Sequence, residues 1–239
     1  MLYYLTLKQT KNVYMFKFFS LIVISSSFAY AEGSQQMMVV LSDELNATVA
    51  SMQRYEYNKR WIKTGESIPV TLGRSGLGYA LIKEPLKNEG DGRSPAGLFD
   101  ISATFGYDVS SNSAMPYYRA DEKLICVDDV NDTRYNTITI SEENRLPASY
   151  EKMRREDGLY RNGIVINYNA SKTKGRGSCI FIHLNHSDHR PTSGCTAMDE
   201  DALNTLLGWL DPQKHPQILQ IPKSDCGEYQ KKFEGIECR

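Results

Sequence analysis

The stretch Gly177-Ser-Cys-Ile-Phe-Ile-His183-Leu-Asn-His186-Ser-Asp-His189-Arg-Pro-Thr-Ser193-Gly194-Cys195-Thr-Ala-Met198 decides the fold that we expect. It opens with an apolar, β-branched run that predicts a buried strand ending at His183. Three of the chain's four histidines lie in it, directly upstream of a cysteine. The stretch therefore predicts a strand that carries several reactive groups in the loop at its end.

Strands are also the main prediction outward from this stretch. Short apolar or β-branched runs with turn residues between them predict strands at 36–41, 48–57, 61–62, 68–72, 124–127, 137–140, 163–168, 179–184 and 218–221. The glycine-rich segment 73–106 predicts loops and turns instead of regular structure. We therefore expect a mostly β domain with a few short helices, an α+β arrangement.

Two helices are expected. A short one is predicted at 149–155, and a longer one at 199–210, where Leu203, Leu206, Leu207 and Leu210 form an apolar stripe at helical spacing. Asp199 is the expected cap of the longer helix. With no repeat or low-complexity linker, the sequence favours one domain over residues 36–222 and a polar C-terminal tail over 223–239.

The composition limits the partners. The chain has 239 residues, 41% of them hydrophobic, and a formal net charge of −1. This suits one soluble globular domain with a proper core. Proteins that bind nucleic acids or membrane surfaces usually carry a basic excess or stripe, and neither is visible here.

The first 31 residues are typical of a secretory signal peptide. From Met15, a short cationic start precedes an apolar run and an Ala-x-Ala ending at Ala31, so residues 1–31 are excluded from the fold, with Met15 as an alternative true start. The run is shorter than the about 20 apolar residues of a transmembrane helix. We expect a periplasmic or secreted protein without stable membrane insertion after cleavage; an uncleaved anchor is the alternative.

Export changes the meaning of the five cysteines, because an oxidising compartment tends to pair thiols. Cys126 with Cys179, and Cys226 with Cys238, are plausible pairs, which would leave Cys195 unpaired. The pairing stays open at this point, since any of the five could instead be an inert buried thiol.

Cys195 and His183 together suggest acyl transfer. A cysteine becomes a useful nucleophile when an imidazole takes its proton, and a strand end holds that imidazole precisely. Gly194 would let the backbone N–H groups of 194 and 195 point at a developing oxyanion. The rival chemistry is a zinc site of His183, His186, His189 and Cys195, but no Cys-x-x-Cys knuckle accompanies them. We expect no metal and no other cofactor.

These residues carry a resemblance to a known family. The block Thr192-Ser-Gly-Cys195 after a strand-end histidine resembles the signature of the L,D-transpeptidase (YkuD-like) catalytic domain, and Gly90-Asp-Gly-Arg-Ser-Pro-Ala-Gly-Leu-Phe99 resembles its upstream turn. Further similar blocks lie in order at 72–77, 105–107, 126–129 with 135–136, and 177–183. There are two departures: Ser193 stands where many members have a second histidine, and in those members the first histidine lies further upstream of the cysteine than His183 does.

The resemblance implies a β-sandwich or barrel-like catalytic domain with Cys195 as nucleophile, His183 as base, Gly194 and Cys195 as oxyanion backbone, and Ser193 hydrogen-bonding in place of the missing histidine. The implied substrate is a peptidoglycan stem peptide, attacked at the L-centre carbonyl of its diamino acid with release of D-alanine. The thioester would pass to an amine, giving a cross-link, or to water, giving an L,D-carboxypeptidase.

Further residues and functions stay open. Arg93 could bind a substrate carboxylate or hold its own loop through backbone carbonyls, and His186 and Thr192 are expected to contribute to substrate binding. An amide hydrolase acting on the same wall peptides is one alternative function. A wall-binding module with an inert Cys195 is another.

Overall fold

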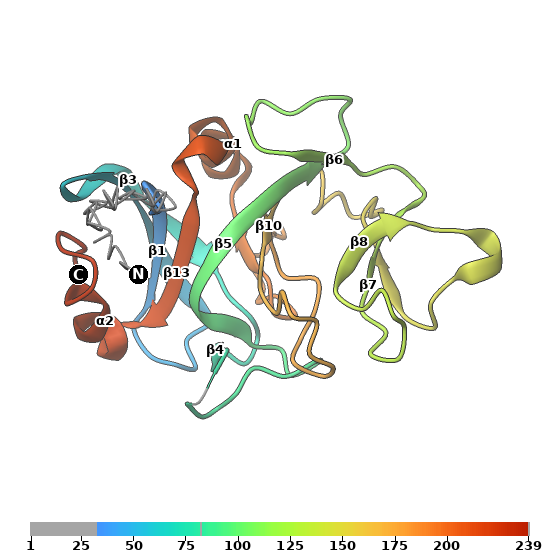
Figure 1. Cartoon of the computed structure of the whole chain (residues 1–239), viewed down its shortest axis with the longest axis horizontal. Helices are drawn as coiled ribbons and strands as arrows, with labels where there is room; N and C mark the ends of the chain where they lie inside the picture. The colour runs from blue at the N-terminus through green and yellow to red at the C-terminus, as the bar shows by residue number, and fades with distance from the viewer. Residues whose placement is uncertain (1–32, 82, 239) are drawn as a thin grey trace, which may run out of the picture. The chain divides into compact units, whose positions relative to one another are not determined.

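The computed structural model describes residues 33–81 and 83–238, and the predicted signal peptide lies outside them. Figure 1 shows the arrangement of the elements. The strands are β1 (Gln36–Ser42), β2 (Val49–Asn58), β3 (Arg60–Thr71), β4 (Leu77–Tyr79), β5 (Ser94–Gly106), β6 (Tyr117–Arg119), β7 (Leu124–Val127), β8 (Thr137–Ile140), β9 (Tyr150–Lys152), β10 (Asn162–Ile166), β11 (Phe181–Leu184), β12 (Thr196–Met198) and β13 (Gln217–Pro222). The helices are α1 (Glu200–Trp209) and α2 (Lys223–Gln230), with 3-10 turns at Glu143–Arg145 and Pro212–Lys214.

The larger sheet closes on itself. Its strand order is β10-β11-β12-β3-β2-β1-β13-β5-β4, and β10 also pairs with β5. Most neighbours are antiparallel, but β1 with β13, β11 with β12, β4 with β5 and the short β6 with β5 are parallel. The seam between β12 and β3 is a single residue pair, Ala197 with Thr71. The expected mostly β, barrel-like fold is confirmed.

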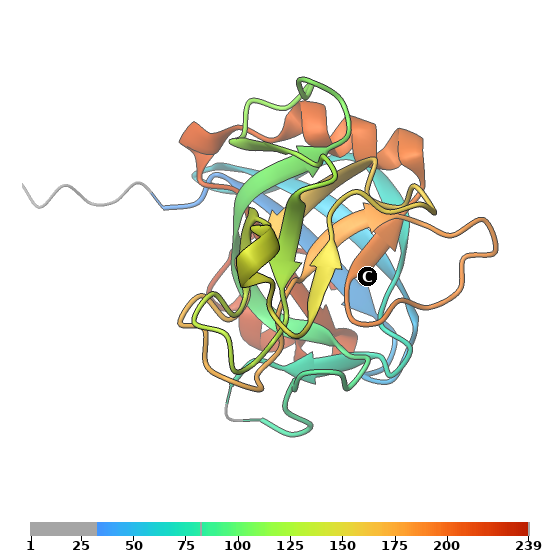
Figure 2. The same cartoon turned by 90° about the vertical axis from the view of Figure 1, so that its right-hand side faces the viewer.

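A smaller sheet, β8-β7-β9, stands beside the larger one at the right of Figure 1 and faces the viewer in Figure 2. The disulfide Cys126–Cys179 joins its central strand, β7, to the segment that leads into β11. Cys126 lies opposite Glu151 of β9 in the strand register. The disulfide therefore fixes β9 relative to β11.

Burial of the apolar runs explains why these strands form. Every residue of β1, β7, β11 and β12 is buried, as expected for strands covered on both faces. Helix α1 buries Leu203, Leu206 and Leu207 in the cluster that contains Ile164 and Ile182 of β10 and β11. Each fully buried leucine stabilises the fold by about 1.5–3 kcal/mol relative to an exposed one.

Two sequence predictions were wrong. The glycine-rich segment 73–106 contains β4 and the long central strand β5, whose Gly97 takes a φ of +149° that other residues rarely adopt. The helix expected at 149–155 is absent, and β9 forms there because its backbone pairs with β7. The prediction also missed β6 and β12. Asp199 does stand at the N-cap of α1, but its side chain accepts a hydrogen bond from Asn185 and makes no cap.

The segment 223–239, expected to be a polar tail, is folded over its described part, to residue 238. It forms α2, and its Cys226 and Ile236 are buried in a cluster with Trp61. The disulfide Cys226–Cys238 closes it. Among the described residues, no helix is long and apolar enough to cross a membrane.

Candidate active site

Cys195 lies at the end of the loop that joins β11 to β12, immediately before β12. Its side chain is buried, and it is the free cysteine of the described chain. Phe181 N–H donates to its sulfur at 3.4 Å, and the thiol points to the carbonyl of Cys179 at 3.5 Å. Both contacts come from the segment entering β11, so the parallel pairing of β11 and β12 sets the position of the thiol.

Hydrogen bonds to its carbonyl oxygen fix the turn that carries Cys195. Thr192 Oγ1 donates to this oxygen at 2.6 Å, and Ser94 Oγ donates to it at 2.8 Å. Gly194 N–H donates to Thr192 Oγ1 at 3.1 Å. Gly194 has a φ of +146°, and a Cβ there would lie 3.0 Å from the carbonyl oxygen of Arg93. A side chain at 194 would therefore strain the turn.

Ser94 connects the Gly90–Phe99 block to this turn. It is fully buried at the start of β5 and also accepts a hydrogen bond from Gly73 N–H at 2.9 Å. A Cβ on Gly73 would lie 2.3 Å from the carbonyl oxygen of Gly92, so only glycine allows this approach. The sequence analysis did not single out Ser94, although the block that contains it was recognised.

His183 stands on β11 with its ring buried. Its Nδ1 lies 2.8 Å from the carbonyl oxygen of Leu184, which selects the tautomer with the proton on Nδ1 and leaves the lone pair on Nε2. The ring of Tyr160 lies 5.2 Å from the imidazole, centroid to centroid. Burial lowers the pKa of His183 to about 4, so the imidazole is neutral near pH 7 and can accept a proton.

The thiol is neutral as well. Burial raises the pKa of Cys195 to about 12, and the nearby carboxylate of Glu151 acts in the same direction. Near pH 7 the site therefore holds a thiol and a neutral imidazole, not an ion pair. In such a pair a neutral imidazole is able to take a proton from a thiol.

His183 and Cys195 line one cavity of about 280 Å³. Two walls form it. The first, which we call the main-sheet wall, contains His183 and Cys195 with the intervening loop. The second, which we call the small-sheet wall, comes from β9 and the segment after it. The lining residues are Glu151, Arg155, Leu159, Tyr160, His183, His186, Arg190, Pro191, Thr192, Ser193 and Cys195.

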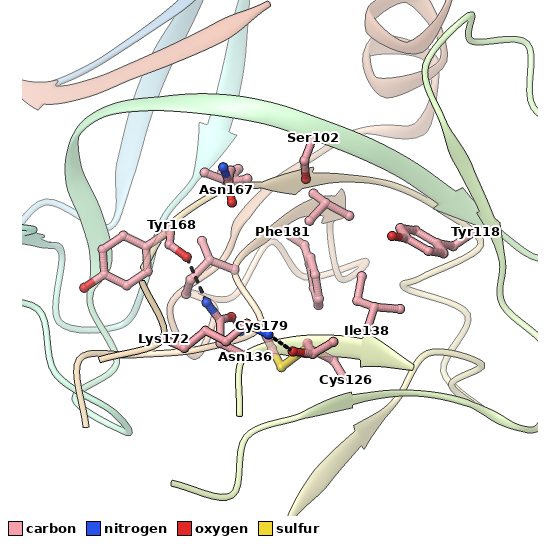
Figure 3. A pocket seen from close by; sticks show the side chains of 14 residues that line it. Ser102, Tyr118, Cys126, Asn136, Ile138, Asn167, Tyr168, Lys172, Cys179 and Phe181 are labelled. Atoms are coloured by element: carbon pink, nitrogen blue, oxygen red, sulfur yellow. Dashed lines mark hydrogen bonds between the residues drawn. A yellow bond between two sulfur atoms is a disulfide. The ribbon is translucent and has the colours of Figure 1, made fainter. Parts of the chain in front are cut away.

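A network behind the disulfide holds the carbonyl that faces the thiol. Cys179 adopts a φ of +54°, which is unusual for a residue other than glycine. Its N–H donates to Asn136 Oδ1 at 3.0 Å, and Asn136 Nδ2 donates in turn to the carbonyl of Tyr168 at 2.9 Å. Figure 3 shows Asn136 and the disulfide at a neighbouring pocket of about 210 Å³. Disulfide and amide together therefore orient the Cys179 carbonyl.

The other residues predicted for the site, His186, Ser193 and Thr192, have different surroundings. His186 lines the cavity beside Arg190, whose Nη2 lies 3.1 Å from His186 Nδ1. Ser193 lies exposed at the rim, and its hydroxyl bonds to no other residue in the described part of the chain. Thr192 is a hydrogen-bonding residue of the Cys195 turn.

Arg93 does not line the cavity. Its Nη1 donates to the carbonyl oxygens of Ser75 and Leu77, each at 2.7 Å, which is the loop-holding alternative for this residue. The zinc alternative also finds no support in the arrangement of side chains. His189 points to Asn185 at 3.0 Å, and the described ranges contain no group of three or more possible metal ligands.

The sequence analysis missed Glu151, Arg155 and Tyr160. The first two lie in the segment predicted as a helix at 149–155. On a short surface helix, charged residues are expected to face the solvent. A strand alternates its side chains between two faces, so a strand at this place would have directed Glu151 to one side. Tyr160 carried no signal of its own.

Comparison with known proteins gives one match. The model of the L,D-transpeptidase catalytic domain family, YkuD, matches residues 45–219, which span β2 to β13 and include both walls of the cavity. No curated protein matches the chain at a significant level.

Proposed function

The chain belongs to the L,D-transpeptidase catalytic domain family, and we propose that it is a cysteine acyltransferase that acts on peptidoglycan stem peptides through Cys195. The observation that carries the proposal is the placement of a free, buried thiol and a neutral imidazole in one cavity of a chain with this family's fold.

In the first half-reaction, Cys195 Sγ attacks the L-centre carbonyl of the diamino acid while its proton passes to His183 Nε2. The carbonyl electron pair moves to oxygen, and Cys195 N–H is the donor that can meet it, since Gly194 N–H already donates to Thr192. Collapse of this intermediate breaks the amide bond. The amine of D-alanine leaves with the proton from His183, and a thioester to Cys195 remains.

In the second half-reaction, an acceptor attacks the thioester and His183 takes its proton. An amine acceptor gives a cross-link between stems, and water gives an L,D-carboxypeptidase. Both release the thiol in its starting form, so the first half-reaction is common to them.

Export is part of the proposal. Two disulfides, Cys126–Cys179 and Cys226–Cys238, suit an oxidising compartment, and the sequence of residues 15–31 is typical of a secretory signal. We therefore place the protein in the periplasm or outside the cell, where stem peptides are accessible.

The test is a digest of purified sacculi treated with the mature protein and analysed by mass spectrometry. The expected result is loss of terminal D-alanine from tetrapeptide stems, absent with Cys195→Ala. Dimers joined between diamino acids identify the amine acceptor, and monomeric tripeptides identify water. Unchanged muropeptides with the wild-type protein would contradict the proposal. The rival wall-binding module predicts retention on sacculi without any chemical change.

A further inference from the structure

The small-sheet wall offers two opposite charges with unused bonding capacity. Glu151 Oε2 accepts from the Tyr160 hydroxyl at 2.7 Å, while no described residue donates to Oε1. Arg155 binds Asp157 through Nε and Nη2, and within the described ranges its Nη1 has no acceptor. Both side chains line the cavity of Cys195.

Two contacts hold these charges close to the reacting groups. The Tyr160 ring that supports Glu151 packs against His183, and the Arg155 guanidinium lies over the same ring at 5.0 Å. On the other side, Cys126 lies opposite Glu151 in the register and is bonded to Cys179, whose carbonyl meets the Cys195 thiol. The distance from the charged pair to the thiol is therefore fixed by a packed ring and by a disulfide.

We propose that Glu151 and Arg155 form a subsite for the distal end of the diamino-acid side chain, where one carbon carries both an ammonium and a carboxylate. Glu151 binds the ammonium and Arg155 Nη1 binds the carboxylate. This inference rests on the proposed function, because it places the diamino acid by the carbonyl that Cys195 attacks. It makes the pocket selective for a diamino acid with a zwitterionic end.

The chemistry of the wall suits such a ligand. Burial raises the pKa of Glu151, because the enclosed carboxylate is poorly solvated, and a ligand ammonium would compensate this loss. A ligand that lacks the ammonium would cover Glu151 Oε1 without giving it a donor and would leave Tyr160 as the one donor to the carboxylate in the described chain, which disfavours its binding. A neutral amide in place of the carboxylate would lose the charge-assisted bond to Arg155.

The test measures binding without turnover, in the Cys195→Ala mature protein, by titration calorimetry. Three soluble tetrapeptide stems are compared: one with meso-diaminopimelate, one with its distal carboxyl amidated, and one with lysine acetylated on its side-chain amine. We expect the affinity to fall in that order. Glu151→Gln, which keeps the acceptor for Tyr160, should weaken the first two stems about tenfold to hundredfold and leave the acetylated stem unchanged.

Arg155→Gln should weaken only the first stem, by about tenfold. The matched controls are Glu156→Gln and Arg154→Gln, exposed neighbours outside this cavity, which should bind all stems as the parent does. Equal affinity of the three stems, no binding of any at millimolar concentration, or an unchanged affinity in Glu151→Gln would overturn the subsite. Release of D-alanine by the Cys195 protein tests the proposed function separately, since it needs turnover.

Discussion

The two walls of the cavity are built differently. The main-sheet wall holds its two reactive groups, His183 and Cys195, buried. Hydrogen bonds from Thr192 and Ser94 to the Cys195 carbonyl fix the turn that carries the thiol. The small-sheet wall carries charges, Glu151 on β9 and Arg155 just after it, beside a three-stranded sheet whose strands are three or four residues long. The difference suggests that reactivity depends on the first wall and discrimination between ligands on the second.

The largest effect should come from the main-sheet wall. His183→Ala removes the proposed base and is expected to lower the rate of D-alanine release by about 10²–10⁴-fold, the usual contribution of general base catalysis. His189→Ala, an exposed histidine outside the cavity, is the control. A rate assay on tetrapeptide stems checks this, and equal rates in the two variants would remove His183 from the mechanism.

The pH dependence of thiol labelling tests whether Cys195 is neutral in the protein without substrate. Because the pKa of Cys195 is raised to about 12, the thiolate fraction should increase about tenfold for each pH unit between about pH 7 and pH 9. Iodoacetamide labelling, followed by mass spectrometry, should rise about a hundredfold over this range. A plateau near neutral pH would indicate a thiolate–imidazolium pair instead.

The neutral thiol and imidazole together predict an activity that is constant over a wide pH range. The imidazole becomes protonated only as the pH falls through about 4, so kcat/KM should hold from about pH 5 to pH 8 and fall below. An acid limb near the ordinary histidine value of about 6.5 would contradict the burial effect.

Removing each disulfide in turn should show that the two bonds have different roles. Cys126→Ser with Cys179→Ser opens a loop of 53 residues and should lower the free energy of unfolding by about 4 kcal/mol, against about 3 kcal/mol for the 12-residue loop of Cys226–Cys238. Urea denaturation measures both. Only the first pair contacts the site, so only its loss should also reduce D-alanine release by about tenfold or more at temperatures where the protein stays folded.

The smallest effect is expected from one hydrogen bond of the reactive turn. Ser94→Ala leaves Gly73 N–H without its buried partner and removes one donor from the Cys195 carbonyl, which should destabilise the protein by about 1–3 kcal/mol. Activity should fall a few-fold. Ser102→Ala, exposed on the same strand, should change neither quantity in the same assays.

The sequence predicted the first wall better than the second. His183, Thr192 and Cys195 sit in one continuous stretch, so local pattern was enough to bring them together. Glu151 reaches the cavity only because β9 pairs with β7 and a disulfide joins β7 to the β11 segment, and such long-range contacts override local propensity. The same holds for β5, where pairing with β10 and β13 outweighs the glycines.

Arg93 shows a second limit of prediction from sequence: the role of a single side chain. A guanidinium in a glycine-rich loop can serve a ligand or its own backbone, and only the positions of the Ser75 and Leu77 carbonyls decide which. Of the two described arginines that line the cavity, Arg155 and Arg190, the first gave no local signal.

The Cys126–Cys179 bond also closes a covalent ring around the small sheet and β10. A protease that cuts the exposed turn at Glu143–Arg145 opens this ring without separating the fragments, because the chain on each side stays attached through sulfur. A nicked molecule would therefore keep its mass in a gel run without reductant and split into two pieces when reductant is added. If the protein is exported as proposed, the two walls of the cavity therefore stay covalently linked after a break in the backbone between them.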